Sequence, residues 1–96
     1  MSQYNKPTVA NVALTTANQE YTYTIPANTR KINVSSRLQG TLRIGFVEGC
    51  TADGQTYKSI PAGSGGLWID AMYLKEQTLY VASDTASDVL EILALD

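Results

Sequence analysis

The chain has 96 residues, no histidine, one cysteine and a formal net charge of −2. These numbers exclude an intramolecular disulfide, histidine-dependent catalytic triads and the usual zinc sites, and they disfavour a nucleic-acid partner. No stretch approaches the ~18 consecutive apolar residues of a membrane-spanning helix, so no membrane partner is expected. Charged residues make up 17% of the chain, against about 25% in ordinary soluble domains, which suits a protein that packs against other subunits or binds sugars.

The N-terminal residues carry no recognisable targeting signal. Residues 1–19 lack both a charged region followed by an apolar stretch and an arginine-rich transit pattern. We therefore expect synthesis in a cytoplasm without export by a cleaved signal. Residues 1–8 are expected to form an N-terminal arm, which is either frayed or ordered by a neighbouring subunit, and residues 9–96 a single domain.

Apolar side chains recur along the chain with a period of two. In one segment Tyr21, Tyr23 and Ile25 alternate with Thr22 and Thr24, as in a strand that buries one face. Turn residues separate eight such segments, although the last could also form a helical turn. The sequence thus predicts an all-β fold, an antiparallel β-sandwich or jelly roll, with strands near residues 9–14, 19–26, 30–36, 41–47, 55–60, 67–72, 78–82 and 88–94.

The two halves of the chain resemble each other. Residues 23–28 and 57–63 share an Ile-Pro-Ala corner, and an apolar pair follows each corner at the same spacing: Ile32 and Val34 in the first half, Leu67 and Ile69 in the second. The pattern indicates either two copies of one strand–corner–strand–loop–strand unit or two turns with the same chemistry.

The alternation also predicts which aromatic residues face outward. If Leu67 and Ile69 point into the core, Trp68 points out, and the same parity turns Tyr80 outward. On neighbouring strands the two rings would form an apolar patch that contacts protein or sugar. A bulge at residues 65–66 would instead place the indole in the core.

Further apolar residues are candidates for partner contacts. The last strand has apolar residues on both faces, as expected for a strand covered by its own core and by a neighbour. The N-terminal arm of residues 1–8 contributes Tyr4 as a further candidate. The predicted contact residues are Trp68, Tyr80, Tyr4, Leu93 and Leu95.

The chain offers few residues for catalysis. Asp84 and Asp88 could match the spacing of a glycosidase pair, but loop acids beside Ser and Thr usually form turns. Cys50 has no histidine to activate it, and no GK[ST] follows the glycine-rich residues 63–66. We therefore predict no catalytic, cofactor-binding or metal-binding residue, no cofactor, and no enzymatic activity.

Several segments resemble the small all-β structural proteins of tailed bacteriophages. The resemblance rests on Tyr-Thr-Ile-Pro-Ala-Asn-Thr at residues 23–29, Ile-Pro-Ala-Gly at 60–63 and Thr-Leu-Tyr-Val-Ala-Ser-Asp at 78–84, and it extends over roughly residues 15–95. It implies a component of the virion, such as a capsid decoration protein or a subunit of a head fibre, connector or tail. No binding residue of that group transfers to a numbered position here.

The sequence therefore predicts a non-enzymatic virion protein, in the first place a capsid decoration protein. Its expected partners are the major capsid protein or other virion subunits, with a homo-oligomer, for example a trimer, as its own state. The alternative is a carbohydrate-binding module in which Trp68, Tyr73 and Tyr80 stack on sugar rings while Asp70 and Asn33 donate or accept hydrogen bonds.

Overall fold

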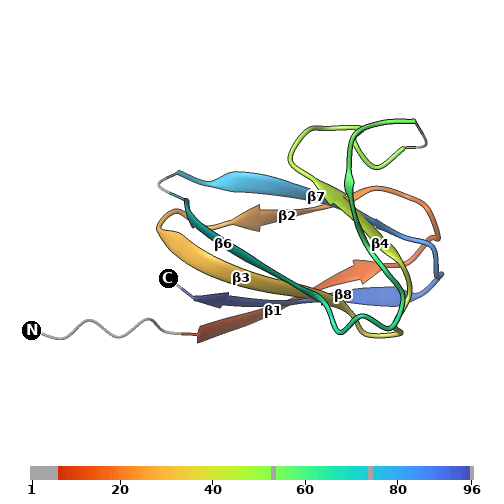
Figure 1. The fold of residues 1–96 in the computed structure, drawn as a ribbon, viewed down its shortest axis with the longest axis horizontal. Coiled ribbons are helices and arrows are strands. Elements are labelled where there is room, and N and C mark those ends of the chain that lie inside the picture. The colour runs from red at the N-terminus through yellow and green to blue at the C-terminus, as the bar shows by residue number, and fades with distance from the viewer. Residues whose placement is uncertain (1–6, 53, 74, 96) are drawn as a thin grey trace, which may run out of the picture.

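A computed structural model describes residues 7–52, 54–73 and 75–95, with residues 70–73 described by their backbone alone. These residues form eight strands and no helix, so none of them builds a helix that could cross a membrane (Figure 1). The strands are β1 (Pro7–Leu14), β2 (Tyr21–Ile25), β3 (Thr29–Ser36), β4 (Leu42–Gly45), β5 (Lys58–Ile60), β6 (Leu67–Tyr73), β7 (Gln77–Ser83) and β8 (Asp88–Leu95).

All eight predicted strands are present, and the last segment is a strand rather than a helical turn. β1 begins at Pro7, so the first strand includes two residues that were expected to belong to the arm. β4 and β5 are shorter than expected because residues 46–52 and 54–57 leave the sheet as a loop, which projects from one end of the molecule (Figure 1).

The strands form two four-stranded antiparallel sheets that pack into a β-sandwich. Sheet A has the order β1-β8-β3-β6 and sheet B the order β2-β7-β4-β5. β1 pairs with β8, β2 with β7, β3 with β6 and β4 with β5, so the chain resembles one long hairpin whose tip is β4–β5. Wrapping that hairpin brings β3 against β8 and β4 against β7, which gives the jelly-roll arrangement.

The strands of the two similar halves have equivalent pairing partners in the sheets. The strands β2, β3 and β4 of the first half correspond to β5, β6 and β7 of the second. β3 pairs with its own counterpart β6, and β4 with its counterpart β7. The pair β2–β7 corresponds to the pair β5–β4, which is also present. The register agrees at the centre, where Ile32 lies opposite Ile69 and Val34 opposite Leu67. The correspondence of Ile32 with Leu67 and of Val34 with Ile69 is therefore a spatial as well as a sequence relationship.

The core lies between the sheets and is almost entirely aliphatic. Alternate residues of every long strand face inward, which explains the period of two. Tyr21 and Tyr23 are partly buried against this core. The fully or almost fully buried aliphatic residues include Leu14, Ile25, Ile32, Val34, Leu42, Ile44, Ile60, Leu79, Val81, Leu90 and Ile92.

Glu20 fixes the loop between β4 and β5 at Gly49 and Thr51. Its carboxylate accepts hydrogen bonds from the Gly49 N–H (2.9 Å), the Thr51 N–H (3.2 Å) and the Thr51 hydroxyl (2.7 Å). Burial would raise the pKa of Glu20, but these hydrogen bonds hold it below its ordinary value. The loop places the Cys50 sulfur where a side chain of Gly45 would lie, and the thiol is buried there.

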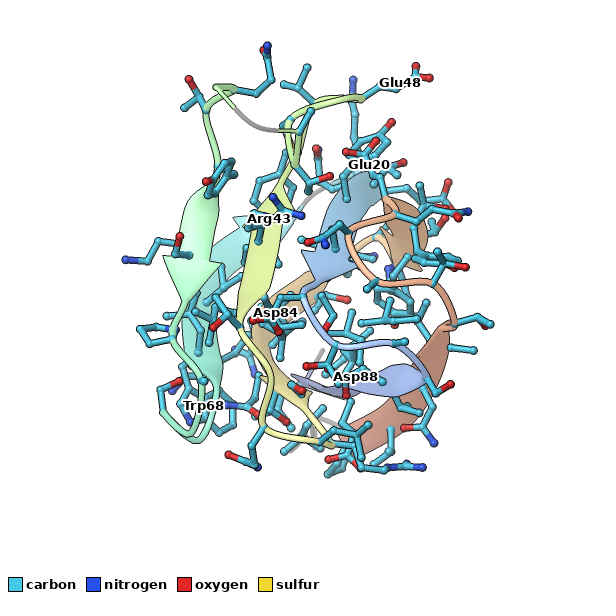
Figure 2. All side chains as sticks on the ribbon, turned by 90° about the vertical axis from the view of Figure 1, so that its right-hand side faces the viewer. Glu20, Arg43, Glu48, Trp68, Asp84 and Asp88 are labelled. Carbon is cyan, nitrogen blue, oxygen red and sulfur yellow. The ribbon has the colours of Figure 1, made fainter. Side chains whose placement is uncertain are left out.

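Replacing Glu20 with alanine is expected to release this loop without unfolding the sandwich. Three hydrogen bonds to one carboxylate are lost, and we expect amide exchange at Gly49 and Thr51 to accelerate about tenfold, which corresponds to about 1.4 kcal/mol of local stability. Hydrogen exchange followed by NMR measures this effect. Glu48→Ala is the control, since Glu48 is exposed on the same loop (Figure 2); equal acceleration in both variants would contradict the assignment.

Candidate functional site

The outer face of sheet A carries a continuous uncharged row of side chains. In the strand register, Val9 of β1 lies opposite Leu93 of β8, Leu93 opposite Asn33 of β3, and Asn33 opposite Trp68 of β6. Val9 is 71% exposed and Trp68 51% exposed. The row therefore crosses the whole sheet and presents apolar surface to the solvent at both edges.

Trp68 faces outward, as the alternation predicts. Its neighbours Leu67 and Ile69 are partly buried and pack against the core. Lys31 lies on β3, the strand next to β6, and its ammonium group is 5.3 Å from the centre of the indole ring, as in a cation–π contact. About half of Trp68 remains exposed to solvent. The bulge that would have moved the indole into the core does not occur at this point of the ladder.

The prediction that Trp68 and Tyr80 form one patch is wrong. β6 belongs to sheet A and β7 to sheet B, so the outward side chains of these strands point to opposite sides of the sandwich. Tyr80 lies instead between Thr22 of β2 and Gly45 of β4 and is half-buried. Apart from β4 and β5, consecutive strands of this chain alternate between the two sheets, a feature that side-chain parity does not reveal.

The other predicted contact residues are distributed as follows. Leu93 and Leu95 lie on the outer face of sheet A and are half-buried, and Leu95 lies opposite both Pro7 and Lys31. Tyr4 lies outside the described residues. Val9 is not among the predicted contact residues, although its position next to Leu93 follows from the β1–β8 pairing.

The outer face of sheet B has a different character. Its exposed strand residues include Thr22 and Thr24, and Arg43 adds a charge that is fixed by Asn18 (2.9 Å) and lies over the ring of Tyr57. Residues 46–52 and 54–57 project from one end of this sheet, where Glu20 accepts hydrogen bonds from Gly49 and Thr51. The row formed by Thr22, Tyr80 and Gly45 on this face is also uncharged, but its ring is half-buried, and the described strand residues of this face expose no large apolar side chain like Val9 or Trp68.

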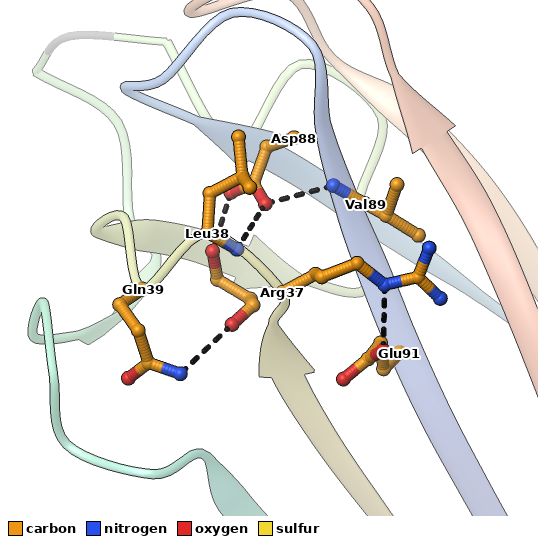
Figure 3. Close-up of polar contacts among 7 residues, drawn as sticks. Arg37, Leu38, Gln39, Asp88, Val89 and Glu91 are labelled. Carbon is orange, nitrogen blue, oxygen red and sulfur yellow. Dashed lines mark hydrogen bonds and ion pairs between the residues drawn. The ribbon is translucent and has the colours of Figure 1, made fainter.

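The two acids with a spacing suited to catalysis have separate structural roles. Asp88 is 1% exposed, and its Oδ2 accepts hydrogen bonds from the hydroxyls of Ser36 and Ser83, the latter at 2.7 Å. Its Oδ1 accepts from the N–H groups of Leu38 (3.0 Å) and Val89 (2.7 Å), as Figure 3 shows. The carboxylate thus joins β8 and β3 of sheet A to β7 of sheet B.

The protonation of Asp88 follows from this environment. Burial would raise the pKa of the carboxyl group, but the four hydrogen bonds outweigh it and hold the pKa below its ordinary value. Asp84, by contrast, is exposed and accepts a hydrogen bond from the Thr41 N–H (3.0 Å). The pair therefore stabilises loops and sheets, and its arrangement is not that of two carboxylates facing each other across a cleft.

Among the described residues, no group of three or more Cys, Asp or Glu side chains is placed to hold a metal ion. An apolar groove of about 500 Å³ lies at the β5–β6 side of the sandwich. The glycine-rich residues 63–66 border a much smaller hollow with Ser35 and Ser36.

Comparisons with known proteins identify no relative: no protein-family model, curated protein or solved structure matches the chain.

Proposed function

We propose that this chain is a non-enzymatic structural subunit of a tailed bacteriophage particle, in the first place a capsid decoration protein. It would bind the shell through the outer face of sheet A. The observation that carries the proposal is the row from Val9 through Leu93 and Asn33 to Trp68, which crosses that face without a charged side chain. The resemblance of residues 15–95 to small phage structural proteins supports the choice of a virion.

The composition of this face is typical of protein contacts. Tryptophan is enriched at interface hot spots, and charged residues are depleted at interface centres. The charges lie beside the row: Lys31 on one side, and on the other Glu91, which forms an ion pair with Arg37 (2.7 Å; Figure 3). An uncharged band flanked by charged side chains matches the depletion of charge at the centre of a specific interface and its polar rim.

The size of the face indicates how the contact would work. Four strands about 4.8 Å apart and seven or eight residues at about 3.3 Å each give a flat area of about 500 Å². Specific interfaces bury about 800 Å² of accessible surface per partner. A single contact of this face is therefore modest, and many copies on one particle would gain retention through avidity.

A carbohydrate-binding module receives no comparable support. Paired stacking rings would have to share one face, but Trp68 and Tyr80 lie on opposite faces. The side chains of Asp70 and Tyr73, which completed that hypothesis, lie outside the described part of the structure.

The test is co-sedimentation of the tagged protein with particles of the encoding phage that lack it. We expect saturable binding by the wild-type protein and at least a tenfold loss of affinity for Trp68→Ala, because a hot-spot tryptophan is worth about 2 kcal/mol or more. Val9→Glu should have a similar effect by placing a charge in the uncharged row.

The matched control is Thr24→Glu, which adds the same charge to an exposed position on the outer face of sheet B. It should bind as the wild type does. Failure of the wild-type protein to bind such particles, or equal loss in all three variants, would overturn the proposal.

A further inference from the structure

The β5–β6 side of the sandwich is open and apolar. A groove of about 500 Å³ lies there between the two sheets, lined chiefly by Ile44, Phe46, Tyr57, Lys58, Leu67 and Ile69. Phe46 is 45% exposed, and Leu67 and Ile69 are only partly buried although they face inward. β6 is an edge strand of sheet A, and no described strand pairs with its outer side.

Strand β8 covers the edge of β3, in the first half of the chain, that corresponds to the free edge of β6. β3, the counterpart of β6, has β6 on one side and β8 on the other. β8 places Ala94 opposite Ile32 and Ile92 opposite Val34, and both residues are buried. Ala94 also borders a hollow together with Tyr23 of β2, so β8 lies over the strand that corresponds to β5.

From this correspondence we infer that the open side accepts an extended segment of a partner protein, which adds as an antiparallel strand to the free edge of β6. Edge strands with unpaired backbone groups accept such segments, which gain affinity from main-chain hydrogen bonds and specificity from alternate side chains. This site is separate from the outer face of sheet A, and the inference does not depend on the proposed function.

The groove specifies the chemistry of that segment. Because Leu67 and Ile69 correspond to Ile32 and Val34, apolar residues of the segment would lie opposite them at alternate positions, as Ala94 and Ile92 of β8 do. Among the described residues that line the groove, Lys58 alone is charged, which favours a carboxylate near its end of the segment. An uncharged core of about five residues with an acidic flank fits these constraints.

The probe is a synthetic peptide with the β8 sequence, residues 88–95, in which Gln replaces Glu91 to keep the core uncharged and glutamates at both ends supply the acidic flank and solubility. It is titrated into the full-length, isotopically labelled protein and followed by NMR and hydrogen exchange. We expect saturable binding with a dissociation constant below about 1 mM, shifts at residues 44–46, 57–58 and 67–69, and slower exchange of β6 amides. Exchange in β3 should not change, since the peptide adds to β6 and does not displace β8.

Two controls separate strand addition from general hydrophobic binding. A peptide with N-methyl groups on alternate amides keeps the side chains but cannot form the ladder, and it should not bind. Phe46→Ala should weaken binding about tenfold, whereas Val47→Ala, at a 70% exposed neighbour that does not line the groove, should leave it unchanged.

Three results would overturn the inference. The first is the absence of saturable binding, and the second is equal binding of the N-methylated peptide. The third is dimerisation without peptide that protects the same β6 amides, which would assign the groove to a second copy of the chain.

Discussion

Replacing Asp88 with alanine is expected to lower the free energy of unfolding by at least about 3 kcal/mol. The substitution leaves four donors without their acceptor: two hydroxyls and two backbone N–H groups. Each buried donor without a partner costs about 1–3 kcal/mol. In a chain of this size, a loss of about 3 kcal/mol corresponds to a fall in Tm of about 12–24 °C, which thermal and denaturant unfolding followed by circular dichroism measure.

Asp84→Ala is the control for this prediction. Asp84 lies in the loop that precedes β8 but is exposed, so its loss should cost about 1 kcal/mol or less. Equal destabilisation by the two substitutions would contradict the role assigned to the buried carboxylate.

The buried Asp88 carboxylate also makes the stability of the protein depend on pH. Its folded-state pKa lies below the unfolded value of about 3.9, so the stabilisation by the ionised form is complete above that value and is lost as the pH falls through the folded-state pKa. The wild-type protein should therefore exceed Asp88→Asn in free energy of unfolding at neutral pH, and the difference should shrink below about pH 4. A difference that stays constant from neutral pH down to about pH 2 would contradict this assignment.

Gly66→Ala is expected to destabilise the protein by about 3 kcal/mol. Gly66 has a φ of +106°, and an added Cβ would lie 2.6 Å from the carbonyl oxygen of Val34 and 2.8 Å from the Cβ of Ser35. Both the backbone conformation and the close approach to β3 exclude a side chain, and each contributes about 1–3 kcal/mol. Denaturant unfolding of the variant measures the sum.

Gly63→Ala in the same loop isolates the steric part. Gly63 also has a positive φ, +71°, but nothing lies within 4 Å of its added Cβ. Its replacement should cost about 1 kcal/mol from the backbone conformation alone. If Gly66→Ala were no worse than Gly63→Ala, the contact with β3 would not be the cause.

Much of the fold could be predicted because the alternation of side chains is local information. Trp68 illustrates this: its neighbours Leu67 and Ile69 face the core, so the direction of the indole follows from the parity of the strand. The eight strand positions rest on the same alternation together with the turn residues between the strands.

The pairing of strands could not be predicted in the same way, because it joins distant parts of the chain. Parity gives the face of a strand on which a residue lies but not the sheet to which the strand belongs, and for this reason it wrongly predicts Tyr80 beside Trp68. The contacts of Asp88 could not be predicted for the same reason, because its partner Ser36 is 52 residues away in the sequence. Its loop-like sequence surroundings indicate a turn residue, although Asp88 begins a strand.

If the outer face of sheet A is an assembly surface, its centre must lie against another subunit in the particle. A photo-crosslinking amino acid at position 33, in the middle of the uncharged row, tests this directly, with position 24 on the outer face of sheet B as the reference. We expect position 33 to be joined to a neighbouring subunit and position 24 to remain free of cross-links. Cross-links from position 24 alone, or from neither position in particles that contain the protein, would show that this face does not mediate assembly.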